Sequence, residues 1–272
     1  TFSPSSFTRI SSSYPFRLSL FTFLLNRSFT IYEETDGAFD ITIYPIMRAW
    51  GFTGEEHRIP TEEELQSLLQ LVDASSLQYD VSTQTLTLPE GVEIDFGGIA
   101  KGYTSQRVAQ IMQEYDINSA ILNLGGNVQL VGAKPDGSSW KVAIKSPDEQ
   151  EEYLGVLSAQ NKAIITSGGY ERYFEENGRK YHHIIDPKTG MPAYNGLQSV
   201  TIVSEDGTLA DGLSTALYVM GTESAVKFWQ NHNDEFDAIL YTDDGTLYVT
   251  EGIADTFTSS HSITVLEKAV AF

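Results

Sequence analysis

Apolar side chains recur at three- and four-residue steps in several stretches of the chain, a spacing typical of helices that bury one face. The first stretch contains Phe21, Leu24, Leu25, Ile31 and Tyr32. It is followed by Asp36-Gly37, and glycine commonly ends a helix because it tolerates the left-handed backbone. The same pattern predicts helices through residues 108–115, over 208–220 with Gly221 as the stop, and over about 223–230.

A further helix is predicted from the segment 61–72. Thr61 is followed three residues later by Glu64, which is the spacing of a capping box. One apolar stripe follows, made of Leu65, Leu68, Leu69 and Val72. We interpret this segment as a structural amphipathic helix.

Short runs rich in β-branched and apolar residues predict strands between these helices. They cover residues 86–88, 92–96, 120–124, 140–145, 163–166, 181–185 and 197–203. Asn177-Gly178 is a strong hairpin signal, and residues 236–241 and 246–250 form another expected hairpin. Residues 1–15 carry little periodicity and are expected to be irregular or edge structure. Strands mixed with inserted helices, without regular βαβ alternation, favour an α+β fold.

Composition narrows the possible partners. The 272 residues carry 17 Lys and Arg against 37 Asp and Glu, a formal net charge of −20, which argues against a nucleic acid partner. Cysteine is absent, so disulfides, thiolate nucleophiles and cysteine-ligated metals are excluded. A phosphate ligand would therefore depend on local features: a metal ion, a helix N-terminus or a few lysines.

Two glycine-containing segments carry candidate site residues. In 37–45, a glycine stop, Asp40 and Pro45 suggest a tight turn into a sheet, where Asp40 caps backbone N–H groups. In 95–103, Asp95 and three glycines lie between an expected strand and helix, and Lys101 adds a positive charge. Such a turn either serves the fold alone or binds phosphate at the helix N-terminus. It has neither the Walker A pattern nor the dinucleotide-binding glycine spacing.

A second glycine pair, Gly125-Gly126, follows an expected buried strand and is interpreted as a tight turn or bulge. Further along, His182 and His183 are adjacent in an expected strand. Because neighbouring strand side chains point to opposite faces, only one of these histidines is able to face a site.

The segment 210–217 places a carboxylate and a hydroxyl one helical turn apart. Asp211 and Thr215 share one helix face, and both offer the hard oxygen ligands that Mg²⁺ prefers. Alternatively, Asp211 is only a favourable partner for the N-terminal end of the helix dipole.

These motifs occur in one order along the chain: Gly-Ala-Phe-Asp-Ile-Thr (37–42), Asp-Phe-Gly-Gly-Ile-Ala-Lys-Gly-Tyr (95–103), Asn-Leu-Gly-Gly-Asn (123–127), Thr-Ser-Gly-Gly-Tyr-Glu-Arg-Tyr (166–173), His-Ile-Ile-Asp-Pro-Lys-Thr-Gly (183–190) and Ala-Asp-Gly-Leu-Ser-Thr-Ala (210–216). Together they resemble the ApbE family of FAD:protein FMN transferases. The resemblance implies a T-fold-like α+β architecture with mixed, largely antiparallel sheets and inserted helices.

The resemblance also implies an activity. Family members use Mg²⁺ to split FAD, transfer FMN to a Thr or Ser hydroxyl of a partner flavoprotein, and release AMP. The implied metal ligands are Gly98 through its main-chain oxygen, Asp211 and Thr215. The implied FAD contacts are Ala38, Phe39, Asp40, Asp95 and Lys101. His183 is the implied catalytic residue, able to take or guide the proton of the acceptor hydroxyl.

Two alternative functions stay open at this stage: an FAD pyrophosphatase that yields FMN and AMP, and a protein that binds flavin without turnover. The family's N-terminal portion, with a Met-Gly-Thr segment and a lipid-bearing cysteine, has no counterpart in this chain. We therefore expect residues 1–272 to form one N-terminally truncated domain. The full-length form is expected outside the cytoplasm, held at the membrane by a lipid anchor.

Overall fold

A seven-stranded sheet forms the centre of the computed structural model, which describes residues 7–10, 15–54, 56–148 and 150–269. Its strands lie in the order β15-β13-β12-β11-β8-β5-β4, and all neighbours are antiparallel except β13 and β15. Their bounds are β4 (Ala120–Leu124), β5 (Asn127–Val131), β8 (Ala163–Gly168), β11 (Leu197–Ser204), β12 (Asp237–Thr242), β13 (Leu247–Thr250) and β15 (Ile263–Leu266).

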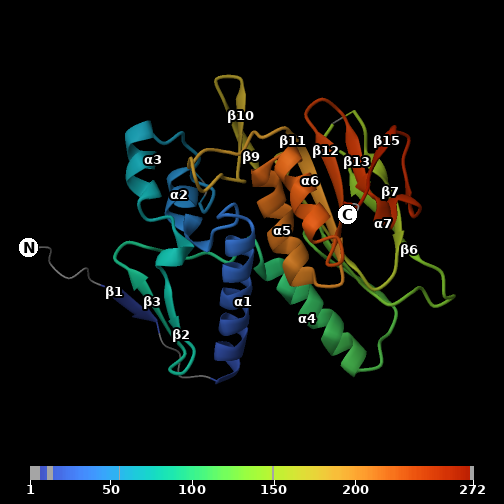
Figure 1. Cartoon of the computed structure of the whole chain (residues 1–272), viewed down its shortest axis with the longest axis horizontal. Helices are drawn as coiled ribbons and strands as arrows, with labels where there is room; N and C mark the ends of the chain where they lie inside the picture. Colours follow the sequence, from blue (N-terminus) through green and yellow to red (C-terminus); the bar gives the residue numbers. More distant parts are fainter. Residues whose placement is uncertain (1–6, 11–14, 55, 149, 270–272) are drawn as a thin grey trace, which may run out of the picture.

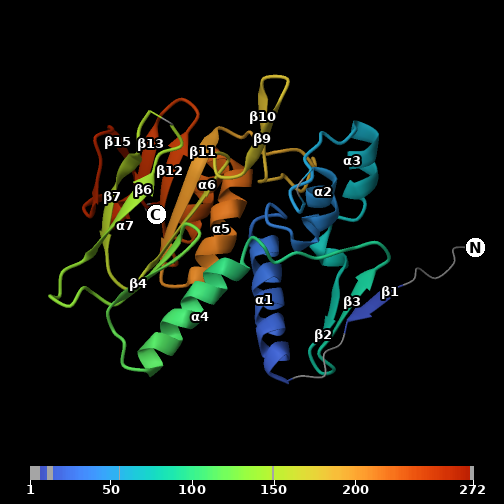
Figure 2. The ribbon, with the colours of Figure 1, turned by 180° about the vertical axis from the view of Figure 1, so that it is seen from behind.

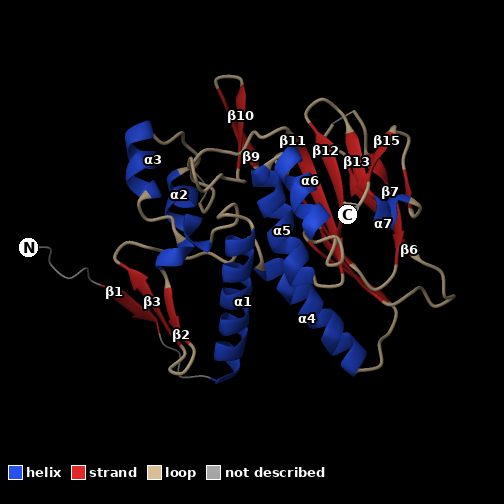
Figure 3. Ribbon diagram, in the orientation of Figure 1, coloured by secondary structure: helices blue, strands red, loops and turns tan. Residues whose placement is uncertain are grey.

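Helices cover one face of this sheet and a small sheet covers the other. The helical layer consists of α4 (Ala100–Glu114), α5 (Gly207–Met220) and α6 (Thr222–Asn231) (Figure 3). The small sheet has the order β14-β7-β6 and the bounds β6 (Trp140–Lys145), β7 (Tyr153–Ala159) and β14 (Phe257–Thr258). Its side chains Ile144 and Leu157 join Leu130 and Ile164 of the large sheet in one buried cluster.

The N-terminal elements form a lobe beside α5. Figures 1 and 2 both place α1 (Pro15–Glu34) between this lobe and the helical layer. The lobe contains a sheet of order β1-β3-β2 with the bounds β1 (Phe7–Ile10), β2 (Gln78–Asp80) and β3 (Thr85–Pro89). The other short elements are η1 (Ile41–Ile43), α2 (Tyr44–Ala49), α3 (Glu62–Leu69), η2 (Ala74–Ser76), β9 (Tyr173–Glu176), β10 (Arg179–His182) and α7 (Glu251–Ala254).

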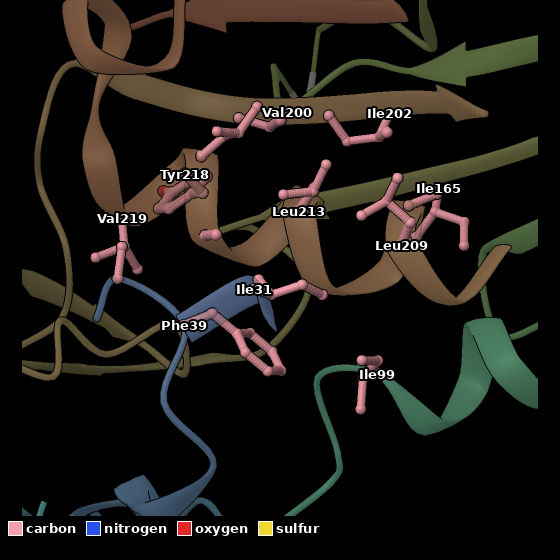
Figure 4. Close-up of a cluster of buried hydrophobic side chains, with 14 of the residues drawn as sticks. Ile31, Phe39, Ile99, Ile165, Val200, Ile202, Leu209, Leu213, Tyr218 and Val219 are labelled. Atoms are coloured by element: carbon pink, nitrogen blue, oxygen red, sulfur yellow. The ribbon is translucent and has the colours of Figure 1, made fainter. Parts of the chain in front are cut away.

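Helix α5 is buried along most of its length. Leu209 and Leu213 of α5 face Ile202 of β11, while Ile31 of α1 approaches from the opposite side (Figure 4). The helix starts where the Asp206 carboxylate accepts hydrogen bonds from two backbone N–H groups. It ends before Gly221, at φ +78°. Because most of α5 is buried, the polar side chains on it are held in place by the surrounding protein.

Most of the expected elements are confirmed, including the hairpin β9–β10 around Asn177-Gly178 and the helices α4, α5 and α6. Thr61 caps α3 by accepting a hydrogen bond from the Glu64 N–H at 3.2 Å, but the Glu64 carboxylate pairs with Arg58. Of residues 1–15, the described residues 7–10 form an edge strand, as expected, whereas Pro15 already begins α1. The α+β fold class is confirmed; the expectation of a single domain stays a prediction.

Other expectations are wrong. Residues 92–96 form no strand, and the Asp95 N–H donates instead to the Ile41 carbonyl at 2.7 Å. The segment 41–49 is helical, because Pro45 lies in the first turn of α2, where no N–H donor is required. Strand β10 stops at His182, since the chain then bends toward the turn at 186–190. The strand before Gly125-Gly126 is a largely exposed edge strand, not a buried one.

No helix in the described part of the chain has the length and apolar character needed to cross a membrane.

Candidate functional site

A pocket of about 560 Å³ lies between the N-terminal lobe, α4, α5 and the base of the β9–β10 hairpin. The nine residues predicted from sequence all line it: Ala38, Phe39, Asp40, Asp95, Gly98, Lys101, His183, Asp211 and Thr215. They come from four segments that are far apart in the sequence. The fold therefore brings the predicted residues together, while their individual roles stay predictions.

Helices α4 and α5 meet at a close crossing that positions Asp211. A Cβ atom on Gly102 of α4 would lie 2.1 Å from the Gly207 carbonyl oxygen and 2.6 Å from the Asp211 Cβ. Only glycine fits there, and the Gly102 N–H donates to Asp211 Oδ2 at 2.7 Å. The residue before α4, Ile99, has no capping side chain, so Asp211 supplies a cap from another helix.

Asp211 is buried, with 4% of its surface exposed. Burial raises the pKa of its carboxyl group, while hydrogen bonds from the Gly102 N–H and the Asn127 amide, and the nearby Lys101 charge, act in the opposite direction. The Asn127 amide donates to Asp211 Oδ1 at 2.9 Å. Both carboxylate oxygens therefore have one neutral donor and keep further lone pairs for a ligand.

A chain of hydroxyl groups orients Thr215. Ser214 donates to the Asp211 main-chain oxygen at 2.8 Å, so its own oxygen accepts from the Ser167 hydroxyl, also at 2.8 Å. Ser167 has then used its proton, and the Thr215 hydroxyl donates to Ser167 at 3.3 Å. The remaining lone pairs of the Thr215 oxygen are left for a cation or a ligand.

The N-terminal lobe contributes a rigid wall. Asp40 accepts hydrogen bonds from Thr42 N–H at 2.7 Å, Thr42 Oγ1 at 2.6 Å and Ala74 N–H at 3.1 Å, so the expected capping role is confirmed. Burial nevertheless raises the pKa of its carboxyl group. The Phe39 ring packs against Gly98, where a Cβ atom would lie 2.9 Å from Cε2 of the ring. This contact fixes the glycine turn that precedes α4.

The same turn is held by Asp95. Its Oδ1 accepts the Gly97 N–H at 2.8 Å, and its own N–H bonds to Ile41 as described above. The turn leads directly into α4, where Lys101 enters the pocket and donates to Asn127 Oδ1 at 3.3 Å. A lysine thus reaches the pocket from the first turn of a helix.

His183 follows the last residue of β10 and is half-buried in the pocket wall. Its Nδ1 lies 3.2 Å from the Arg172 carbonyl oxygen, and because a carbonyl only accepts, Nδ1 bears the proton. Burial, reinforced by the Arg172 charge, lowers the pKa of the His183 ring to about 4. The neutral ring therefore has Nε2 available as a proton acceptor. As expected, the adjacent His182 faces elsewhere and bonds to the Ala193 carbonyl at 3.0 Å.

Some residues of this pocket had no role in the sequence-based prediction. Lys145 extends from β6, and its Nζ lies 5.3 Å from the centre of the Tyr170 ring. The Tyr170 hydroxyl is buried and has no hydrogen-bond partner in the described structure. Burial also raises the pKa of the Glu171 carboxyl, whereas the positive charges of Lys101 and Lys145 lower it. Tyr170 and Glu171 were visible in the motif 166–173, whereas nothing in the sequence around Lys145 indicated a site.

The donor set here suits a hard cation. Gly98 offers a carbonyl, Asp211 a carboxylate and Thr215 a hydroxyl oxygen with free lone pairs. These are ligands of the kind that Mg²⁺ takes alongside water and phosphate oxygens. Within the described ranges, no three His, Asp or Glu side chains cluster as a complete metal cage. The residues present would suit a Mg²⁺ ion, and a phosphate oxygen would be a further ligand of the same kind.

Comparison with known proteins gives consistent results. A family model described as the ApbE family matches residues 3–240. The chain is 35% identical to a Vibrio cholerae protein named FAD:protein FMN transferase, over 89% of this chain and 73% of that one. A Haemophilus influenzae protein of the same name is 32% identical, over 83% of this chain and 67% of that one.

Solved structures extend this similarity to the fold. The ApbE protein of Thermotoga maritima superposes with a TM-score of 0.82 at 34% identity, covering 92% of this chain and 79% of that one. The flavin transferase ApbE of Vibrio cholerae gives a TM-score of 0.79 at 30% identity, covering 93% of this chain and 80% of that one. With its ordered motifs gathered in one pocket and this similarity in sequence and fold, the chain belongs to the ApbE family.

Proposed function

We propose that this protein is an FAD:protein FMN transferase that moves FMN from FAD to a Thr or Ser hydroxyl of a partner flavoprotein and releases AMP. One observation carries the proposal: nine residues predicted for this reaction, from four distant segments, line a single pocket. The names of the Vibrio and Haemophilus relatives support it.

Cationic side chains line the pocket together with four carboxylates, those of Asp40, Asp95, Glu171 and Asp211. The protein carries a net charge of −20, yet Lys101, Lys145 and Arg172 all line this pocket. Phosphoryl transfer depends mainly on positioning and on neutralising charge. We assign Lys101 to the pyrophosphate, because its ammonium group is held near Asn127 at the first turn of α4. Ala38, Phe39, Asp40 and Asp95 are assigned to the remaining FAD contacts.

Mg²⁺ is the proposed cofactor, held by the Gly98 carbonyl, Asp211 and Thr215. When bound, it supplies charge neutralisation for the pyrophosphate oxygens. Asp211 suits this role because its charge is neutralised by no direct ion pair among the described residues.

His183 is the proposed general base. Its neutral ring presents Nε2, which takes the proton of the acceptor hydroxyl. The hydroxyl oxygen forms a bond to the phosphorus on the FMN side of FAD. The bond from that phosphorus to the bridging oxygen breaks, and AMP leaves with the electron pair. The products are a phosphoester-linked FMN on the acceptor, AMP, and a protonated His183 that returns its proton to solvent.

Product analysis separates this reaction from its alternatives. Purified protein is incubated with FAD and Mg²⁺, with and without an acceptor protein that the Vibrio cholerae relative modifies, and the nucleotides are resolved by chromatography. A transferase forms AMP in proportion to the acceptor modified. Equal AMP and free FMN without acceptor would instead identify a pyrophosphatase. FAD binding with no AMP in either reaction would identify a flavin-binding protein.

Two substitutions test the assigned roles. Asp211→Ala should abolish Mg²⁺-dependent turnover while the circular dichroism spectrum stays that of the folded protein, because burial already disfavours this charge. Wild-type turnover by this variant would refute the metal assignment. His183→Ala should slow transfer by about 10²–10⁴-fold and change FAD affinity little. Equal losses in both would make His183 a binding residue.

The proposed location is outside the cytoplasm, on the membrane surface through a lipid anchor. The resemblance to the family is its support. Fractionation of cells that express the natural gene tests it: the protein should appear with membranes and be released by detergent. Recovery in the cytoplasmic fraction would contradict this location.

A further inference from the structure

Asn127 is placed at the pocket by a tight hairpin. Gly125 and Gly126 connect β4 and β5 with φ values of +60° and +98°, a combination that favours glycine at both positions. The Asn123 Oδ1 accepts the Gly126 N–H at 2.9 Å and closes the turn. Asn127, the first residue after this turn, is 2% exposed. Its side chain is therefore held by the hairpin and points into a buried space.

The Asn127 amide joins two charged groups of opposite sign. Its NH₂ group donates to Asp211 Oδ1 at 2.9 Å, and its oxygen accepts from Lys101 Nζ at 3.3 Å. A carboxylate only accepts and an ammonium only donates. One orientation of the amide satisfies both contacts, so the side chain acts as a directional bridge.

The two charged groups meet at this amide without pairing with each other. No ion pair between Lys101 and Asp211 occurs among those of the described residues, although both contact the same amide group. A direct contact would use Lys101 to neutralise Asp211, and a neutralised carboxylate is a poor ligand for Mg²⁺. A smaller side chain at position 127 would leave both groups without this partner and free to approach one another, and the attraction is strengthened because Asp211 is buried, although Lys101 is exposed.

We propose that Asn127 is a positioning residue that separates Lys101 from Asp211, so that the lysine stays available for phosphate and the carboxylate for Mg²⁺. This inference rests on the proposed function. It concerns a residue that contacts both groups without being a metal ligand or a base. Asn127 is the residue whose loss is expected to join the two charges.

The test is Mg²⁺ affinity, measured by titration calorimetry of the folded protein with Mg²⁺ alone, without FAD or acceptor. Asn127→Ala should weaken Mg²⁺ binding about tenfold. A hydrogen bond to a charged group contributes roughly a factor of ten, and without Asn127 the Lys101 ammonium pairs directly with the Asp211 carboxylate. Adding Lys101→Met should restore the affinity to within about threefold of Lys101→Met alone, since the competing cation is gone. Asn127→Ser, which is too short to bridge, repeats the test if the alanine variant unfolds.

Asn118→Ala is the matched control, because it removes an exposed asparagine just before β4 whose amide bonds to the Asp116 carbonyl, away from Lys101 and Asp211. It should leave Mg²⁺ affinity unchanged. If Asn127→Ala binds Mg²⁺ like the wild type, or if Lys101→Met restores nothing, the separating role is wrong even where FMN transfer has been established. If the wild type binds no Mg²⁺, the inference fails together with the metal assignment, whatever the outcome for flavin binding.

Discussion

Replacing Gly102 by alanine tests how the α4–α5 crossing shapes the site. The new Cβ atom would lie 2.1 Å from the Gly207 carbonyl oxygen, whereas Cβ contacts below 3.0 Å essentially never occur. The helices must therefore move apart by about 1 Å at this point, and such overpacking costs about 1–3 kcal/mol. The same movement lengthens the hydrogen bond from the Gly102 N–H to Asp211.

The expected net loss of stability is about 2 kcal/mol. The higher helix propensity of alanine returns about 1 kcal/mol, while weakening of a hydrogen bond to a charged group removes part of about 1.5–3 kcal/mol. Urea unfolding followed by circular dichroism should show a midpoint lower by roughly 0.5–1 M. Because Asp211 loses its position, Mg²⁺ affinity measured by calorimetry should fall as well.

Gly54→Ala is the matched control. A Cβ atom on Gly54 has no neighbour within 4 Å, and the backbone there lies outside the left-handed region. This variant should be unchanged or more stable by about 0.4–1 kcal/mol. A Gly102→Ala protein with wild-type stability and Mg²⁺ affinity would refute the argument that this close crossing fixes the carboxylate.

Two further predictions concern the pH dependence of stability and the packing of Trp50 in the N-terminal lobe. Burial lowers the pKa of His182 and His183 to about 4, so below pH 6.5 the unfolded chain binds protons that the folded chain does not. The contribution of these histidines to the unfolding free energy should be fully present above pH 6.5 and be lost as the pH drops toward 4, opposite in sign to that of the buried carboxyls with raised pKa. Urea titrations should therefore show a stability difference between the wild type and His182→Gln that shrinks on acidification, and a difference that stays constant from pH 7 to 4.5 would contradict this. Trp50 is fully buried and donates to the Gly190 carbonyl at 2.8 Å. Trp50→Ala should therefore lower the melting temperature by roughly 10 °C or more, with a smaller loss for Trp50→Phe, and equal losses would count against a packing origin.

Much of the fold was predictable because local signals and tertiary packing agree. The Asn177-Gly178 turn and the stop at Gly221 are set by backbone preferences that any context must satisfy. The apolar stripe of α3 likewise predicts its buried face. The failures lie where packing decides. Residues 92–96 have the composition of a strand but no partner strand, and Val92, Ile94 and Phe96 pack instead against the main core.

The site was predictable where chemistry is concentrated in short motifs, as at Asp211 and Thr215 on one turn of α5. It was not predictable where a residue reaches the pocket only through the sheet arrangement. Lys145 is an alternating strand residue like its neighbours, and its place above Tyr170 depends on how the small sheet packs on the large one. The bridging role of Asn127 depends in the same way on the meeting of a hairpin with two helices.

The most direct test of the central claim is the intact mass of an acceptor protein after incubation with this protein, FAD and Mg²⁺. The proposal predicts a mass increase of one FMN phosphoester per acceptor Thr or Ser, which disappears when a chelator is added or when Asp211→Ala replaces the wild type. An unmodified acceptor that the Vibrio cholerae relative modifies under the same conditions would contradict the proposed function.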